Sequence, residues 1–119
     1  MSELYQLSIK EKLEGLKNSS FSSLELTESY LERIKRIDSE LNSYITVIEE
    51  EARVKAKESD QRYQAESPLP LDGIPIAHKD IFCTEGVLTT CGSKMLSNFI
   101  SPYSATVVKK YEESGSVVL

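Results

Sequence analysis

The chain has 119 residues, 39% of them hydrophobic and 28% charged, a balance that suits a soluble globular domain with a buried core. No apolar run approaches the roughly 20 residues that cross a bilayer, and residues 1–5 lack the basic and apolar regions of a signal peptide, so we expect a cytoplasmic protein without membrane contact. The net charge of -5 and the mixing of Lys and Arg with Glu leave no continuous positive surface for direct nucleic-acid binding.

Three amphipathic helices are predicted in the first half of the chain. The first runs from Ser8 to about Lys17, opens with Ser8 and Glu11 in capping-box spacing, and meets Asn18 as a left-handed stop. The second opens with the same spacing at Ser22 and Glu25. Its apolar face is formed by Leu26, Tyr30, Ile34, Ile37 and Leu41. After a turn at residues 42–43, a third helix is predicted from apolar residues at helical spacing. These residues are Ile45, Ile48, Ala52, Ala56 and Tyr63.

A change of composition follows at residues 66–73, where two prolines and a glycine end the helical pattern. We therefore divide the chain into a helical arm, residues 1–66, and the start of an α/β core, residues 67–119. Residues 74–77 and 116–119 are predicted strands, with a helix between them at about residues 105–113. Because two strands cannot cover their own edges, we expect an incomplete sheet, whose last strand would promote self-association unless a partner covers it.

Lys79 is the residue whose position could carry chemistry. It follows the apolar residues 74–77 and precedes Ile81 and Phe82, so partial burial would favour the neutral amine, which can serve as a general base. The alternative is a lysine at a strand end whose ammonium reaches water or pairs with Asp80. Composition and spacing alone favour this alternative and do not make Lys79 catalytic.

Three segments resemble the amidase-signature enzymes. Residues 71–80, LDGIPIAHKD, are similar to the segment that supplies the lysine of their Ser–cis-Ser–Lys triad. Residues 89–96, TTCGSKML, and 102–108, PYSATVV, are similar to the next two blocks of the branch formed by the A subunits of tRNA-dependent amidotransferases. The resemblance implies an α/β fold of the amidase-signature type, here an N-terminal helical arm plus the first strands and helix of its mixed sheet.

The resemblance also implies a reaction. Lys79 would accept a proton, through a bridging serine, from the nucleophilic serine that attacks the amide carbon of glutamine, and the ammonia would amidate glutamate carried on its tRNA. The implied partners are the B and C subunits, with tRNA bound only through the complex. No cofactor or metal is expected in this chain, while ATP and Mg are expected at a partner subunit. Because both serines would lie beyond Leu119, we expect the isolated chain to be inactive.

Several alternatives remain open at this point. Ser93 follows Gly92 but lacks the second glycine of a nucleophile elbow, so a loop hydroxyl that caps a helix is favoured. Cys83 and His78 form a conceivable nucleophile–base pair without an orienting partner. With one histidine and two cysteines, Cys83 and Cys91, soft ligands are too few for a zinc site, and free thiols are expected. A non-enzymatic docking module and a hydrolase of other carboxamides remain as alternative functions. Residues His78 and Phe82 depart from the family pattern, which bears on the substrate pocket.

Overall fold

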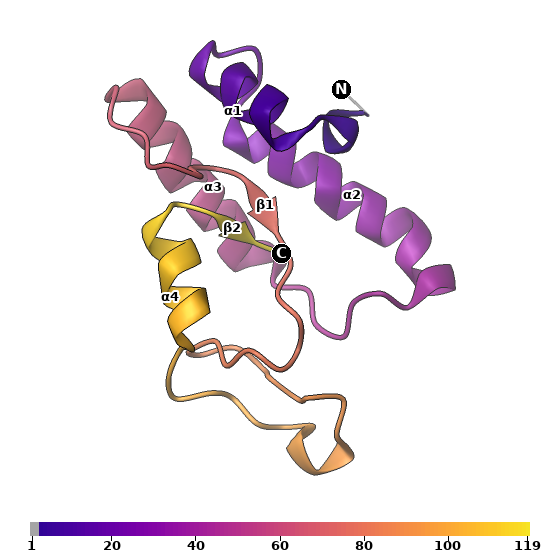
Figure 1. Cartoon of the computed structure of the whole chain (residues 1–119). Helices are drawn as coiled ribbons and strands as arrows, with labels where there is room; N and C mark the ends of the chain where they lie inside the picture. The colour runs from indigo at the N-terminus through magenta and orange to yellow at the C-terminus, as the bar shows by residue number, and fades with distance from the viewer. Residues whose placement is uncertain (1–2) are drawn as a thin grey trace.

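The computed structural model describes residues 3–119 (Figure 1). Met1 and Ser2, the first residues of the segment in which we predict no signal peptide, lie outside the described residues. The elements in chain order are the 3-10 helix η1 (Leu4–Gln6), α1 (Ile9–Lys17), α2 (Ser23–Leu41), α3 (Glu49–Gln64), β1 (Pro75–Ile76), the 3-10 helix η2 (Lys94–Leu96), α4 (Thr106–Glu113) and β2 (Val117–Val118). Within residues 3–119, every helix is too short or too polar to cross a membrane.

Capping boxes start the first two helices, as predicted. In α2, the Ser22 hydroxyl accepts from the N–H of Glu25 at 3.0 Å, and the Glu25 carboxylate accepts from the N–H of Ser22 at 2.8 Å. Ser8 and Glu11 make the same reciprocal pair at α1. Each box satisfies two backbone donors that the first turn of a helix leaves unpaired.

The helix ends differ in part from expectation. The prediction that Asn18 is the left-handed stop of α1 is wrong, because its N–H still bonds back to Glu14 and the positive φ, 56°, occurs at Ser19. The second helix ends at Asn42, which is left-handed with φ 53° and ψ 43°. Asparagine tolerates this conformation better than most residues, so Asn42 redirects the chain after α2.

The third helix begins later than its apolar spacing predicted. Residues 43–48 form an irregular link, and α3 starts only at Glu49. Tyr44 and Val47 pack against the buried core from this link, whereas Ile45 is 64% exposed. The apolar spacing of the link thus reflects packing of an extended segment, and the acidic first turn of α3, starting at Glu49, suits the positive end of the helix dipole.

The core forms where α2 and α3 pack side by side and the two strands lie against them (Figure 1). One buried cluster joins both helices to β2. Its buried members are Leu31, Ala52, Ala56, Val117 and Leu119. The small side chains of Ala52 and Ala56, both fully buried, allow close approach of α3 to its neighbours.

The sheet has two parallel strands, with Pro75 opposite Val117 and Ile76 opposite Val118. The N–H groups of Val117 and Leu119 donate to the carbonyls of Ile74 and Ile76 at 2.9 and 3.0 Å. The missing N–H of Pro75 costs no bond to β2, because the bonds between the strands involve the flanking residues Ile74 and Ile76. The strand–helix–strand pattern is confirmed, while the division of the chain at residue 66 stays a prediction.

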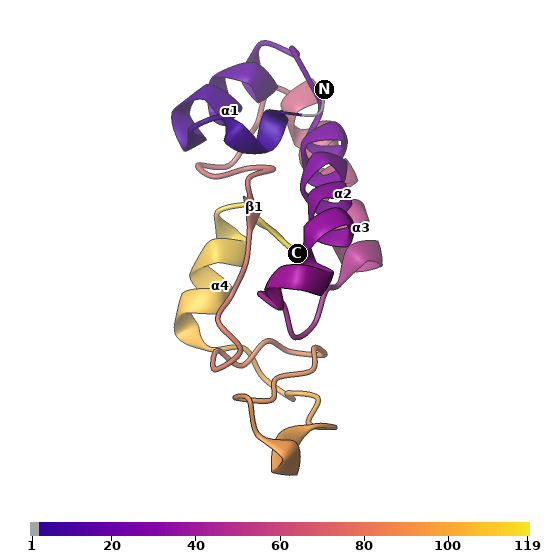
Figure 2. The same cartoon turned by 90° about the vertical axis from the view of Figure 1, so that its right-hand side faces the viewer.

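A lobe of irregular structure, residues 83–105, lies between β1 and α4 and extends away from the helices (Figure 2). It folds back on itself through backbone bonds, among them an antiparallel bridge between Leu88 and Ile100 and a bond from the N–H of Ala105 to the carbonyl of Cys83 at 2.8 Å. The lobe therefore begins and ends at nearly the same place, beside the first turn of α4.

A buried ion pair fastens the start of β1 to α3. Asp72 is completely buried and accepts two bonds from the Arg62 guanidinium, at 2.7 and 2.6 Å. Its carboxylate also accepts from the N–H of Leu69 at 3.0 Å. Burial by itself would raise the pKa of Asp72, but the bonds from Arg62 and Leu69 outweigh it and hold the pKa below the ordinary value.

Gly115, in the turn between α4 and β2, lies against the same residue. It has a φ of 85°, and a Cβ placed on it would lie 2.7 Å from the Oδ1 atom and 2.9 Å from the Cα atom of Asp72. The N–H of Gly73 donates to the Gly115 carbonyl at 2.9 Å. Only glycine combines the left-handed backbone with this close approach.

Replacing Asp72 by Asn should lower the free energy of unfolding by about 3 kcal/mol, because the partly exposed guanidinium of Arg62 loses its buried counter-charge. The pKa of Asp72 is lowered on folding, so its contribution is complete above the ordinary value of 3.8 and is lost as the pH falls through the folded value. Denaturant unfolding of both proteins between pH 7 and pH 2 measures this, and the gap between them should shrink in acid. A constant gap would contradict the assignment.

Gly115→Ala should destabilise the protein more than Gly86→Ala. Both glycines have positive φ, 85° and 75°, but a Cβ on Gly86 meets no atom within 4 Å. The Gly86 variant should therefore cost only about 1 kcal/mol for the left-handed backbone, and the Gly115 variant should add the clash with Asp72. Thermal unfolding of the two variants separates these contributions, and equal losses would show that the close approach does not matter.

Candidate functional site

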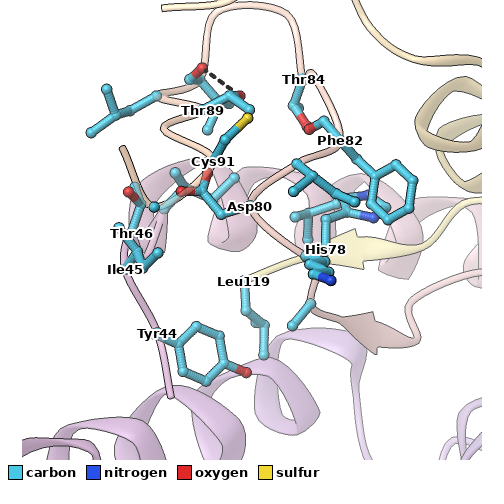
Figure 3. Close-up of a pocket in the computed structure, with 18 of the residues that line it drawn as sticks. Tyr44, Ile45, Thr46, His78, Asp80, Phe82, Thr84, Thr89, Cys91 and Leu119 are labelled. Carbon is cyan, nitrogen blue, oxygen red and sulfur yellow. Dashed lines mark hydrogen bonds between the residues drawn. The ribbon is translucent and has the colours of Figure 1, made fainter. Parts of the chain in front are cut away.

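A hollow of about 580 Å³ lies beyond the carboxyl end of β1. Three segments form its walls: the link of residues 43–48, the lysine segment of residues 77–82, and residues 87–92 of the lobe. Leu119, at the end of β2, also contributes to the lining, as do His78 and Cys91 (Figure 3). A parallel strand that ends at a hollow is a common position for binding residues in α/β proteins.

Lys79 belongs to the lining of this hollow, three residues after the end of β1. Its side chain is exposed, so the expected partly dry setting for its amine is not found among residues 3–119. None of the ion pairs within residues 3–119 includes Lys79, and the alternative pairing with Asp80 does not form. The Lys79 head group instead reaches solvent at the hollow, which is the other possibility that the sequence left for a lysine at a strand end.

Asp80 instead turns toward the lobe. Its Oδ1 atom accepts from the N–H of Thr90 at 3.0 Å, and its Oδ2 atom accepts a short bond from the Thr90 hydroxyl. The backbone carbonyl of Asp80 accepts from the N–H of Cys91 at 2.8 Å. Asp80 therefore holds residues 90 and 91 beside the lysine segment.

The structure does not bring His78 and Cys83 together. The His78 ring lies edge-on to the Tyr111 ring of α4, with centroids 5.7 Å apart, and its buried Nε2 atom has no hydrogen-bond partner among residues 3–119. Burial lowers the pKa of His78, with a smaller opposing effect of Glu112, so the ring is neutral near pH 7. The thiol of Cys83 instead contacts the Tyr103 hydroxyl at 3.6 Å. A Cys–His nucleophile pair is not formed.

Ser93 takes the structural role that the sequence favoured. Its hydroxyl accepts from the N–H of Met95 at 3.2 Å and caps the 3-10 helix η2. Both cysteines are free thiols. Within residues 3–119, no group of three His, Cys, Asp or Glu side chains is arranged to hold a metal ion.

Two contributors to the site were missed from the sequence. The link of residues 43–48 lines the hollow although it was predicted to be mostly helical, and Thr90 holds Asp80 although the two are ten residues apart. Thr90 follows Thr89 in an irregular segment that has no helical or strand periodicity. The sequence therefore could not predict the contact with Asp80, which is seen only in the folded lobe.

Comparison with known proteins places the chain in a family. The family model described as Amidase matches residues 25–119. The chain therefore belongs to the amidase family, and its structural neighbours are amidase-signature enzymes.

Its relatives include the A subunits of glutamyl-tRNA(Gln) amidotransferase from Psychrobacter cryohalolentis, 54% identical over all 119 residues, and from Acinetobacter baumannii, 55% identical over the same length. The chain spans 24% of the length of these relatives. Among solved structures, it resembles the peptide amidase of Stenotrophomonas maltophilia, with a TM-score of 0.92, 26% identity and coverage of 100% of this chain and 25% of that one. It also resembles a bacterial aryl acylamidase, with a TM-score of 0.88, 27% identity and coverage of 95% of this chain and 24% of that one.

Proposed function

We propose that this chain is the N-terminal, lysine-bearing part of the A subunit of a glutamyl-tRNA(Gln) amidotransferase, the subunit that hydrolyses glutamine to release ammonia. The observation that carries the proposal is the identity of 54–55% to proteins of that name over all 119 residues, a length that includes residues 71–80, 89–96 and 102–108. The solved structures of the aryl acylamidase and the peptide amidase share the fold at 26–27% identity.

In this proposal Lys79 is the final proton acceptor. A serine hydroxyl attacks the amide carbon of glutamine, and its proton passes through a second serine to the Lys79 amine. That proton then passes to the leaving nitrogen, so ammonia departs, and water hydrolyses the acyl ester to glutamate and restores the serine hydroxyl. An ammonium has three donors and no acceptor, so Lys79 must be neutral when it acts. The remaining three-quarters of the relatives' length would supply both serines and the surroundings that favour the neutral amine.

The position of Lys79 supports this role. It lines a hollow of about 580 Å³ beyond the end of β1, and no carboxylate within residues 3–119 pairs with its amine. A pairing carboxylate would stabilise the ammonium and oppose proton acceptance. The free head group leaves Lys79 available to a serine that approaches across the hollow.

The partners follow from the same proposal. The ammonia passes to a partner subunit, which amidates the activated glutamate on its tRNA with ATP and Mg bound there, and the complex comprises B and C subunits in the cytoplasm. The net charge of -5 supports tRNA contact through other subunits rather than through this chain.

Another carboxamide substrate is the second candidate, favoured by the resemblance to the peptide amidase and the aryl acylamidase. These neighbours are 26–27% identical, about half the identity to the amidotransferase subunits. The two candidates are separated by comparing, with one preparation, the rate of glutamine hydrolysis and the rates of hydrolysis of peptide amides and anilides.

The variant Lys79→Ala is tested in the full-length A subunit, assembled with its B and C subunits. It should lower the rate of ammonia release from glutamine by about 1000-fold, within the range for loss of a general base. Lys79→Arg should lower the rate of ammonia release by the same factor, because a guanidinium stays charged and accepts no proton. Coupled detection of glutamate and ammonia gives the rates.

Three controls accompany this measurement. Lys109→Ala removes an exposed lysine on α4 and should keep the full rate. Amidation of the tRNA with added ammonium salt bypasses glutamine and should survive Lys79→Ala, which shows that the complex is intact. The 119-residue chain alone should release no ammonia. Full activity of Lys79→Ala would refute the role of Lys79, and Lys79-dependent turnover by the isolated chain would refute the prediction that the isolated chain is inactive.

A further inference from the structure

The part of the lysine segment that surrounds Lys79, residues 77–81, is tied to the lobe through one residue, while Phe82 at its end accepts a bond from the Thr84 hydroxyl. Among residues 3–119, the hydrogen bonds that join residues 77–81 to residues 84–104 all end on Asp80. The neighbouring residues Lys79 and Ile81 are exposed and make no such bond. The place of Lys79 relative to the lobe therefore depends on Asp80.

Thr90 is built to hold that carboxylate. Its side chain is 7% exposed, its hydroxyl donates to Asp80, and the same hydroxyl accepts from the N–H of Gly92 at 3.2 Å. The N–H of Thr90 supplies the second bond to the carboxylate. One threonine thus gives Asp80 two donors while fixing the turn that follows.

That turn has an unfavourable backbone conformation. Cys91 and Gly92 both have positive φ, 52° and 67°, and a left-handed conformation is disfavoured for cysteine. The N–H of Cys91 points to the Asp80 carbonyl at 2.8 Å, and the N–H of Ser93 bonds to the Thr90 carbonyl at 2.8 Å. Strain of this kind persists where the surrounding contacts fix it, and it is often found beside functional residues.

We propose that Asp80 is a positioning residue, which acts through Thr90 to hold the Lys79 backbone in place at the hollow. This rests on the proposed function, because it assigns a task to Asp80 only if Lys79 accepts a proton. Asp80 turns its carboxylate to Thr90, away from a role in binding glutamine. We call the contact between Asp80 and Thr90 the clamp. Loss of the clamp lets the lysine segment shift, and a displacement of about 1 Å can lower a rate about 100-fold.

The test measures glutamine hydrolysis by the assembled amidotransferase for variants at both ends of the clamp. Asp80→Ala should lower kcat about 100-fold, and Thr90→Val, which keeps shape and N–H but loses the hydroxyl, about 10-fold. The KM for glutamine should change by less than about threefold, because only the reacting geometry is altered. Asp80→Ala combined with Thr90→Val should be no slower than Asp80→Ala alone, because the two residues act as one unit.

Conservative variants supply the rescue. Thr90→Ser keeps the hydroxyl and should hold kcat within about twofold, and Asp80→Asn should retain kcat within about fivefold, since its amide can still accept from one donor and bond to the hydroxyl. Thr27→Val is the matched control: this buried threonine of α2 has a hydroxyl without a hydrogen-bond partner among residues 3–119, and its loss should leave kcat unchanged.

The outcomes separate the two proposals. If Lys79→Ala is inactive while Asp80→Ala and Thr90→Val keep full kcat, the positioning role is overturned and the proposed function stands. If Lys79→Ala is fully active, both fall. A loss as large for Asp80→Asn as for Asp80→Ala, or a loss confined to KM, also overturns positioning. If Asp80→Ala fails to assemble, the comparison of Thr90→Val with Thr90→Ser decides, and equal rates refute the clamp.

Discussion

The buried contact between Asp72 and Arg62 is the constraint on which the placement of the site depends. Asp72 lies three residues before β1, and Arg62 lies near the end of α3. The pair fixes where the chain leaves the helices and enters the sheet, and Gly115 brings the second strand onto the same carboxylate. A charge that is fully buried tolerates little displacement, because moving its partner away exposes an uncompensated charge. The start of β1 is therefore rigid, and the hollow beyond its end is placed relative to α3.

From that fixed point the chain becomes irregular within a few residues. After Ile76, residues 77–93 form no helix or strand beyond the bridge residue Leu88. The position of Lys79 therefore depends on the few bonds made by the side chain and carbonyl of Asp80 rather than on a backbone ladder. Asp72 before β1 and Asp80 after it thus have similar structural roles. Each carboxylate accepts more than one hydrogen bond and fixes one end of the segment of residues 72–80. The difference is burial, since Asp72 is closed off and Asp80 is only half-buried.

Much of the architecture was readable in the sequence, and the reasons differ by element. The boxes at Ser8 and Ser22 are local hydrogen-bond motifs, so three residues of spacing suffice to predict them. The strands around Ile76 and Val117 were predicted from apolar runs bounded by turn residues. The link of residues 43–48 was misassigned because its side chains reach the core at spacing that imitates a helix. Composition and spacing allowed both a partly buried Lys79 and one that reaches water, because the sequence shows which residues are apolar, not which way the chain turns after a strand.

The candidate site shows the same limit more sharply. Resemblance to a family singled out Lys79, but nothing in the sequence pointed from Asp80 to Thr90, since a contact between irregular segments has no period and no motif of its own. Such contacts are set by how the lobe folds back, through bonds such as that from the N–H of Thr89 to the carbonyl of Phe99 at 3.0 Å. Residues 89–96, one of the three segments that carry the resemblance to the family, include the threonine that holds Asp80. Two of those segments, residues 71–80 and 89–96, therefore supply the two halves of one contact, which gives a physical reason for considering them together.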